Sequence, residues 1–249
     1  MNRKRYFYVC IISVIINALF VALGGYVVYS RGGLSYVAKT FAPKDEQNFL
    51  TPHYVDKKDI FKAMPLDSSK IIFLGDSITE NCGWAELFQD IRMVNQGISS
   101  DTTLGVLDRL KAVADSKPSK IFIMIGVNDL AKNRSIPQIT ASYRNIIAFL
   151  KEETPNTEIY IQSVLPINNA KLHDIHNIQN IQNKDIEALN EKLKILSTSL
   201  GVQYINLYPL FLDQQKQLDS QYSLDGLHLN GKGYILWKDT LIACSIKDL

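Results

Sequence analysis

The segment IIFLGDSIT (71–79) decides the fold of this 249-residue chain. Its first four residues are apolar, and Gly-Asp-Ser ends the apolar run. Runs of this length that are rich in Ile and Val are typical of strands buried on both faces of a sheet. Four further runs follow along the chain, namely IRMVN (91–95), KIFIMIG (120–126), EIYIQSV (158–164) and VQYINLY (202–208).

Amphipathic segments separate these runs and predict helices near 102–115, 136–153, 184–200 and 231–246. Ser135 with Pro137 marks the start of the second helix, and Gly201 marks the end of the third. Parallel strands need crossover connections, which are usually helices. Alternating strands and helices therefore predict an α/β fold, a three-layer α/β/α sandwich with a five-stranded parallel sheet. A short helix near 53–64 is expected to pack on this domain.

Polar residues follow the apolar runs, where ligands bind in sheets of this kind. Ser77 follows the first run, Gly97 the second and Asn128 the third, and Asp225 and His228 stand near the C-terminus. The strand ends thus bring together a hydroxyl, a glycine amide, a carboxamide and an Asp/His pair. These are the groups that acyl transfer to a serine requires.

The role of each residue follows from this chemistry. Serine is a weak nucleophile until a base takes its proton, and His228 is the candidate base for Ser77. Asp225 can fix the other ring nitrogen of that histidine. The main-chain N–H groups of Ser77 and Gly97 and the side-chain amide of Asn128 are candidate donors to an oxyanion. Alone, each residue has an ordinary explanation as a turn or cap, but together and in this order they favour a site.

Four blocks carry these residues, and they resemble the SGNH, or GDSL, family of serine esterases and lipases over roughly 60–249. The resemblance implies a flavodoxin-like SGNH hydrolase fold, a catalytic triad of Ser77, Asp225 and His228, and no cofactor or metal. It also implies an oxyanion hole formed by Ser77, Gly97 and Asn128. QSVLP (162–166) and the last block resemble the branch of platelet-activating-factor acetylhydrolases and bacterial carbohydrate acetylesterases. The blocks are GDSIT (75–79), NQGIS (95–99), GVND (126–129) and DGLHLN (225–230).

An uncharged apolar stretch of 24 residues runs from Tyr6 to Tyr29 near the N-terminus. As a helix rising about 1.5 Å per residue it would reach about 36 Å, which exceeds a bilayer's hydrocarbon core of about 30 Å. Arg3, Lys4 and Arg5 precede it, and the positive-inside rule keeps such residues in the cytoplasm. We therefore predict one transmembrane helix, with the chain beyond it outside the cytoplasm.

Secretion after signal cleavage is the alternative, because Ala22-Leu23-Gly24 offers a small-residue cleavage site. The apolar region of a signal peptide usually spans about 7–15 residues, which is shorter than this stretch, so we favour the retained anchor. The predicted organisation is a cytoplasmic tail (1–5), a signal-anchor (6–30), a stalk (31–52) and an SGNH hydrolase catalytic domain (53–249).

Charge and cysteine content exclude several classes of protein. The chain beyond residue 31 holds 23 of the 27 basic residues and all 25 acidic residues, so a basic nucleic-acid-binding surface is not supported. Three cysteines cannot form a disulfide scaffold, although Cys82 and Cys244 fall in the exported part, where a disulfide is allowed. His173 and His176 have no HExxH motif or cysteine pair beside them, so a metal site is not expected.

The sequence therefore predicts a membrane-anchored, extracytoplasmic serine esterase that acts through an acyl-enzyme. Short-acyl esters of carbohydrates, such as O-acetyl groups, are the preferred substrates, because of the family branch, the exported location and the polar segment 167–183. The alternatives are a lysophospholipase or lipid esterase and, in a different class, a non-catalytic glycan-binding protein on the same fold. These residues do not distinguish hydrolysis from acyl transfer, and they do not indicate an oligomeric state.

Overall fold

A computed structural model describes residues 49–64, 66–172, 178 and 180–244, together with Tyr8, Ile12, Ser13, Ile16, Asn17 and Tyr26. The predicted cytoplasmic tail, most of the predicted signal-anchor and stalk, and both His173 and His176 lie outside the described residues. Among the residues that are described, no helix is both long and apolar enough to cross a membrane. The chain divides into two compact units, 1–47 and 48–249, and the second unit contains the sheet.

The sheet has five parallel strands in the order β2-β1-β3-β4-β5, which confirms the predicted α/β fold. Every residue of β1 and β3 is buried, which explains the apolar runs 71–74 and 121–124 within them. The edge strand β2 begins at Met93 rather than Ile91, which is 85% exposed in the turn before the strand. The strands are β1 (Ile71–Gly75), β2 (Met93–Gly97), β3 (Lys120–Met124), β4 (Glu158–Gln162) and β5 (Gln203–Ile205).

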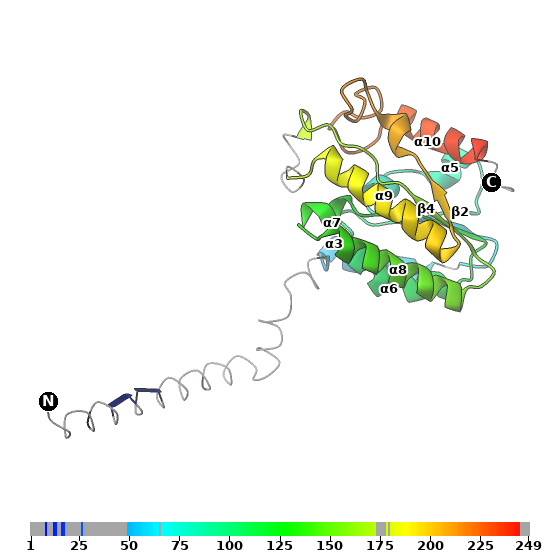
Figure 1. The fold of residues 1–249 in the computed structure, drawn as a ribbon. Coiled ribbons are helices and arrows are strands. Elements are labelled where there is room, and N and C mark those ends of the chain that lie inside the picture. The colour runs from blue at the N-terminus through cyan, green and yellow to red at the C-terminus, as the bar shows by residue number, and fades with distance from the viewer. Residues whose placement is uncertain are drawn as a thin grey trace. The chain divides into compact units, whose positions relative to one another are not determined.

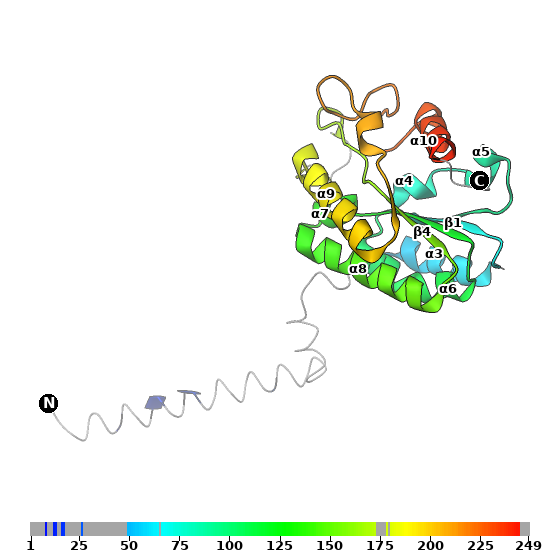
Figure 2. The same cartoon turned by 45° about the vertical axis from the view of Figure 1, so that its right-hand side comes forward.

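Helices cover both faces of this sheet, as Figures 1 and 2 show. One face carries α6 (Thr103–Asp115), α8 (Ile136–Glu153) and α9 (Asn183–Leu200), which lie side by side in that order. The opposite face carries α4 (Ser77–Glu80), α5 (Trp84–Phe88) and α10 (Gly231–Ala243). The last run of the sequence forms only three residues of strand before the 3₁₀ helix Tyr208–Phe211, which has a proline in its first turn.

Aromatic side chains form much of the core on the α4–α5–α10 face. Phe73 of β1 stacks on Trp84 with ring centroids 3.8 Å apart and on Phe122 of β3 at 5.1 Å. Trp237 of α10 meets the Trp84 ring edge-to-face at 4.9 Å. Trp84 is therefore a core residue. Cys82 is buried and Cys244 is exposed, and both are free thiols.

The helix α3 (Pro52–Ala63) precedes the sheet, as the sequence predicted for this region. The Thr51 side chain caps it by accepting a hydrogen bond of 3.1 Å from Tyr54 N, and Pro52 occupies its first position. Tyr54 and Phe61 are buried with Phe49 and Ile98 in a small separate cluster. This cluster joins α3 to the chain that follows β2.

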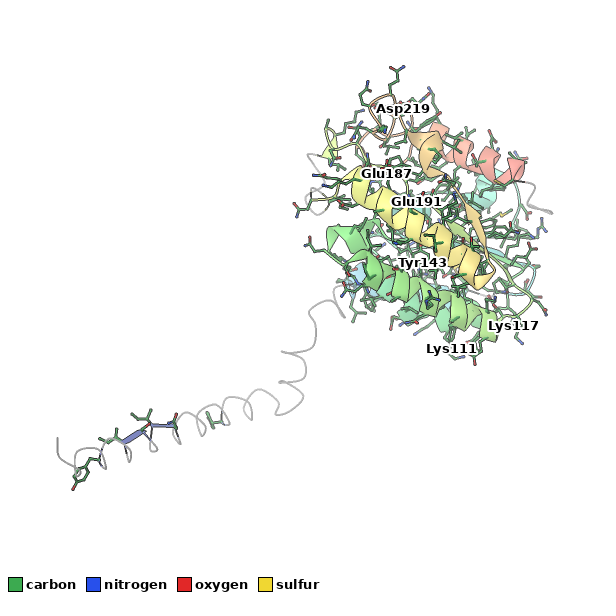
Figure 3. All side chains as sticks on the ribbon, viewed as in Figure 1. Lys111, Lys117, Tyr143, Glu187, Glu191 and Asp219 are labelled. Carbon is green, nitrogen blue, oxygen red and sulfur yellow. The ribbon has the colours of Figure 1, made fainter. Side chains whose placement is uncertain are left out.

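The strand ends that matter for function lie at one end of the domain. Lys117, which stands before β3, and Asp219, which lies in the loops after β5, mark opposite ends of the domain in Figure 3. Because all five strands are parallel, Ser77, Asn128 and the chain after β2 emerge together at the Asp219 end.

Candidate active site

Ser77, His228 and Asp225 form one continuous chain of hydrogen-bonding groups. Ser77 Oγ lies 2.9 Å from His228 Nε2, although the two residues are 151 positions apart in sequence. His228 Nδ1 lies 2.7 Å from Asp225 Oδ2. The His228 side chain is 29% exposed and that of Asp225 is 39% exposed, so both are accessible from solvent. The structure thus brings together the three residues that the sequence predicted as a triad.

The block around Ser77 makes a tight turn from strand to helix. Asp76 caps α4 by accepting a hydrogen bond of 3.0 Å from Ile78 N. Gly75 has no room for a side chain, because a Cβ there would lie 2.2 Å from Thr79 Oγ1 and 2.4 Å from Met124 O. Tyr234 of α10 donates 2.8 Å to Ile78 O and ties α4 to that helix. Ser77 is therefore held at the first position of α4, beyond the end of β1.

The loop that carries Asp225 and His228 is organised by the carboxylate of Asp225. Its Oδ1 accepts hydrogen bonds of 2.9 Å from Leu227 N and 2.8 Å from His228 N. Burial raises the pKa of the Asp225 carboxyl, but the hydrogen bonds from the His228 ring and from these two amides lower it below its usual value. Gly226 has a φ of +84° and accepts 2.8 Å from Asn168 N, so the segment that begins at 167 lies beside this loop.

Asn128 lies in the short helix α7 (Val127–Ala131), directly beyond β3. Its side-chain Nδ2 donates a hydrogen bond of 3.0 Å to the carbonyl of Asp101. A primary amide has two N–H groups, so this bond leaves the second one available. Tyr143, labelled in Figure 3, fixes the end of β3, because its hydroxyl donates 2.8 Å to Ile125 O and accepts 3.1 Å from Ile125 N.

Gly97 does not offer the free N–H group that the sequence led us to expect. This N–H donates 2.8 Å to Asn95 Oδ1 and therefore already has an acceptor within the protein. The absence of a side chain is required here for another reason: a Cβ on Gly97 would lie 2.2 Å from Glu80 N and 2.7 Å from Glu80 Cα. Gly97 allows β2 to approach α4 closely.

The turn from Ile98 to Asp101 provides a different main-chain donor. Asp101 N donates 3.1 Å to Ile98 O, and Ser100 adopts a φ of +64° at the centre of the turn. In the part of the chain that the structure describes, the Ser100 N–H has no acceptor. Sequence reasoning missed this residue, because a serine gives no sign of the left-handed conformation that glycine would have indicated.

Buried charges lie beneath these donors, and the sequence analysis did not identify them. Asp101 pairs with Arg109 at 2.9 Å, with both side chains at most 2% exposed. Arg109 also donates 3.2 Å to Gly75 O, so it connects the turn to the end of β1. Burial raises the pKa of Asp101 to about 6, although Arg109 opposes the shift, and raises that of Asp76 to about 7. Asp129 forms a second buried pair with Arg134 at 2.5 Å.

No group of three or more metal-ligating side chains occurs among the described residues.

Comparison with known proteins identifies the class of molecule. The model of the GDSL-like Lipase/Acylhydrolase family matches residues 73–236. Platelet-activating factor acetylhydrolase IB subunit alpha2 of Rattus norvegicus is 26% identical over 170 residues, which cover 66% of this chain and 70% of that protein. The alpha1 subunit of Homo sapiens is 23% identical over 171 residues, with the same coverage.

Solved structures show the same architecture. A Streptococcus pneumonia protein named after platelet activating factor superposes with a TM-score of 0.72 at 27% identity, covering 80% of this chain and 95% of that one. A GDSL-like lipase from Bacteroides thetaiotaomicron gives 0.67 at 24% identity, covering 79% and 98%. An acetyl xylan esterase gives 0.59 at 20% identity, covering 71% and 100%, and these last two likenesses establish the shared fold.

The fold and these matches define a serine ester hydrolase. The chain belongs to the GDSL-like lipase/acylhydrolase family, which confirms the resemblance seen in its four sequence blocks.

Proposed function

We propose that Ser77 is the nucleophile, His228 the general base and Asp225 the group that orients the imidazole. The observation that carries this proposal is the hydrogen-bonded chain with distances of 2.9 and 2.7 Å. The ionised Asp225 accepts a hydrogen bond from His228 Nδ1–H, which leaves the lone pair of Nε2 directed at the Ser77 hydroxyl. We assign this tautomer from the hydrogen-bond partners.

The reaction proceeds in two halves through an acyl-enzyme. In the first, Ser77 Oγ attacks the ester carbonyl while its proton passes to His228 Nε2, and the tetrahedral intermediate collapses as His228 returns that proton to the leaving alcohol. In the second half, water takes the place of the alcohol. It attacks the acyl group, its proton passes through His228 to Ser77 Oγ, and the carboxylic acid is released.

The oxyanion of each tetrahedral intermediate requires positioned donors. We assign this role to the N–H groups of Ser77 and Ser100 and to the side-chain amide of Asn128. The N–H of Ser77 has no acceptor within the described part of the chain, and neither has that of Ser100. Gly97 was the donor predicted from sequence; its hydrogen bond to Asn95 favours Ser100 instead.

The proposed substrates are short-acyl esters of carbohydrates, with O-acetyl groups first. Support comes from relatives named acetylhydrolases and from the polar segment that begins at Ile167, which lies against the His228 loop through Asn168. A lipid esterase is the second candidate, and the apolar stretch from Tyr6 to Tyr29 favours it by placing the enzyme at a bilayer.

We also propose that the catalytic domain lies outside the cytoplasm, tethered by this apolar stretch. The proposal rests on the 24 uncharged residues and on the basic residues Arg3, Lys4 and Arg5 before them. In untreated cells the catalytic domain should be recovered in the membrane fraction. Protease added to intact cells should digest it. Recovery of the domain in the medium would instead favour signal cleavage and secretion.

The deciding experiment compares the purified full-length chain with Ser77→Ala on p-nitrophenyl acetate and p-nitrophenyl octanoate. Hydrolysis that depends on Ser77 and is much faster for acetate supports the short-acyl assignment and justifies a screen of acetylated glycans. A rate that rises with chain length favours lipid esters. If neither ester is turned over and a fluorophosphonate probe fails to label Ser77, the non-catalytic glycan-binding alternative is favoured.

A further inference from the structure

The carboxylate of Glu80 joins three segments that are separate in the sequence. Glu80 is the last residue of α4, the helix that begins with Ser77. Its Oε2 accepts hydrogen bonds of 2.6 Å from Ser99 N and 2.5 Å from Ser99 Oγ, in the turn that contains Ser100. Its Oε1 lies 2.8 Å from Lys57 Nζ and 3.0 Å from His53 Nε2, both on α3.

The turn held by Glu80 carries or supports two of the proposed oxyanion donors. Ser99, which donates both its groups to Glu80, directly precedes Ser100. The carbonyl of Asp101, one residue further along, holds the Asn128 amide. A serine at a φ of +64° costs conformational energy, so neighbouring contacts must hold Ser100 in that geometry.

Glu80 is a partly buried carboxylate, and both of its oxygens have hydrogen-bond or ion-pair partners. Its side chain is 12% exposed. Burial would raise the pKa of this carboxyl, but hydrogen bonds from Lys57, Ser99 and His53 lower it to about 2. The carboxylate therefore stays ionised, and its bonds to Ser99 are charge-assisted and strong. Lys57 supplies the compensating positive charge from a helix that lies before the matched family region of 73–236.

We infer that Glu80 is a positioning residue. Lys57 of α3 holds the Glu80 carboxylate in place, and Glu80 fixes the Ile98–Asp101 turn so that the Ser100 N–H and the Asn128 amide donate to the same oxyanion. This inference rests on the proposed function. It gives α3 a part in turnover, although no described residue of this helix forms a hydrogen bond or ion pair with Ser77, Asp225 or His228.

The test compares Lys57→Met with Lys58→Met on neighbouring positions of α3. Lys58 pairs with Asp108 of α6 and, among the described residues, forms no hydrogen bond or ion pair with Glu80 or the turn, so it is a matched control for loss of one α3 lysine. We expect Lys57→Met to lower kcat for p-nitrophenyl acetate several-fold and Glu80→Ala to lower it about tenfold. Both losses are smaller than the roughly 10²–10³-fold loss of kcat that follows removal of a whole oxyanion donor. KM should change little, and Lys58→Met should stay within twofold of wild type.

The pH profile separates positioning of the donors from damage to the triad. If Lys57→Met displaces only the oxyanion donors, the plateau value of kcat/KM falls. The pH at the midpoint of the acid limb then stays the same as in wild type. A shifted midpoint, an unchanged kcat in both Lys57→Met and Glu80→Ala, or an equal loss in Lys58→Met would overturn the inference. Glu80→Gln, which retains an acceptor for Ser99, should recover part of the activity lost in Glu80→Ala.

A measurement that needs no turnover keeps the inference distinct from the proposed function. Amide hydrogen exchange at Ser99 and Asp101, whose N–H groups donate to Glu80 Oε2 and to Ile98 O, should be faster in Lys57→Met than in wild type and unchanged in Lys58→Met. If the wild-type protein lacks Ser77-dependent activity, the proposed function fails and this exchange result alone decides the positioning role. Equal exchange in all three proteins would contradict it.

Discussion

The side-chain amide of Asn128 donates a hydrogen bond of 3.0 Å to the main-chain carbonyl of Asp101. This bond joins the helix after β3 to the turn after β2, two segments that lie on opposite sides of β1 in the sheet. Asp101 in turn pairs with Arg109, which also holds the carbonyl of Gly75 at the end of β1. The three strand ends that meet at Ser77 are thus linked to one another as well as to the sheet.

Asn128→Ala tests the importance of this link and of the proposed donor. We expect kcat on p-nitrophenyl acetate to fall about 10²–10³-fold, the scale of one lost oxyanion donor. Steady-state kinetics gives the answer directly, and a urea unfolding curve shows whether the variant is folded. A kcat within twofold of wild type would exclude Asn128 from the oxyanion hole.

Ser77→Ala should abolish turnover and labelling by a fluorophosphonate while leaving the fold intact. The Ser77 side chain is only partly buried, and among the described residues its hydroxyl has a hydrogen-bond partner only in the His228 ring, so its removal leaves no cavity in the core. Circular dichroism and a thermal unfolding midpoint close to wild type provide the control. Full residual activity would refute the assignment of the nucleophile.

Gly97→Ala and Ser100→Gly should have opposite effects on stability. A Cβ at Gly97 meets the backbone of Glu80, so we expect the free energy of unfolding to fall by about 1–3 kcal/mol, the usual cost of overpacking. Glycine at Ser100 removes the strain of the left-handed conformation and should leave stability equal or higher by about 1 kcal/mol. Urea unfolding measures both values.

The activity of Ser100→Gly tests whether Ser100 acts through its main chain and not through its side chain. Ser100→Gly retains the N–H group, so its kcat should stay within about twofold of wild type. A large loss of activity in Ser100→Gly, or a fully stable Gly97→Ala variant, would contradict our account of this turn.

Asp76→Asn should change how stability depends on pH. Burial raises the pKa of the Asp76 carboxyl to about 7, above its value in an unfolded chain. Between about pH 4 and pH 7 the folded state therefore binds more protons at this position than the unfolded state, and its contribution to stability falls as pH rises. Asparagine cannot ionise, so the variant should lose less stability than wild type over this range.

Urea unfolding at about pH 5 and about pH 8 measures the effect. Burial also raises the pKa of Asp101, to about 6. Asp101 is present in both proteins, so its contribution to the pH dependence largely cancels in the comparison. An identical difference in stability between the two pH values for wild type and Asp76→Asn would show that Asp76 does not titrate in this range.

Much of the fold and part of the site could be predicted from the sequence. Uninterrupted apolar runs such as that of β1 are soluble only when both faces of the strand are covered, so the alternation with helices determined a parallel sheet. Parallel strands end on one side, so Ser77 after β1 and Asn128 after β3 were expected to meet. His228 was expected there because serine chemistry needs a base.

Only the tertiary structure decided the details of the donors. Whether the N–H of Gly97 or that of Ser100 is free depends on the Asn95 side chain and on a local φ angle, neither of which a sequence pattern specifies. The hydrogen bond from Arg109 to Gly75 O and the contact of Lys57 with Glu80 join residues that are distant along the chain. Periodicity reports which face of an element is buried, whereas the direction of one hydrogen bond is set by packing between elements.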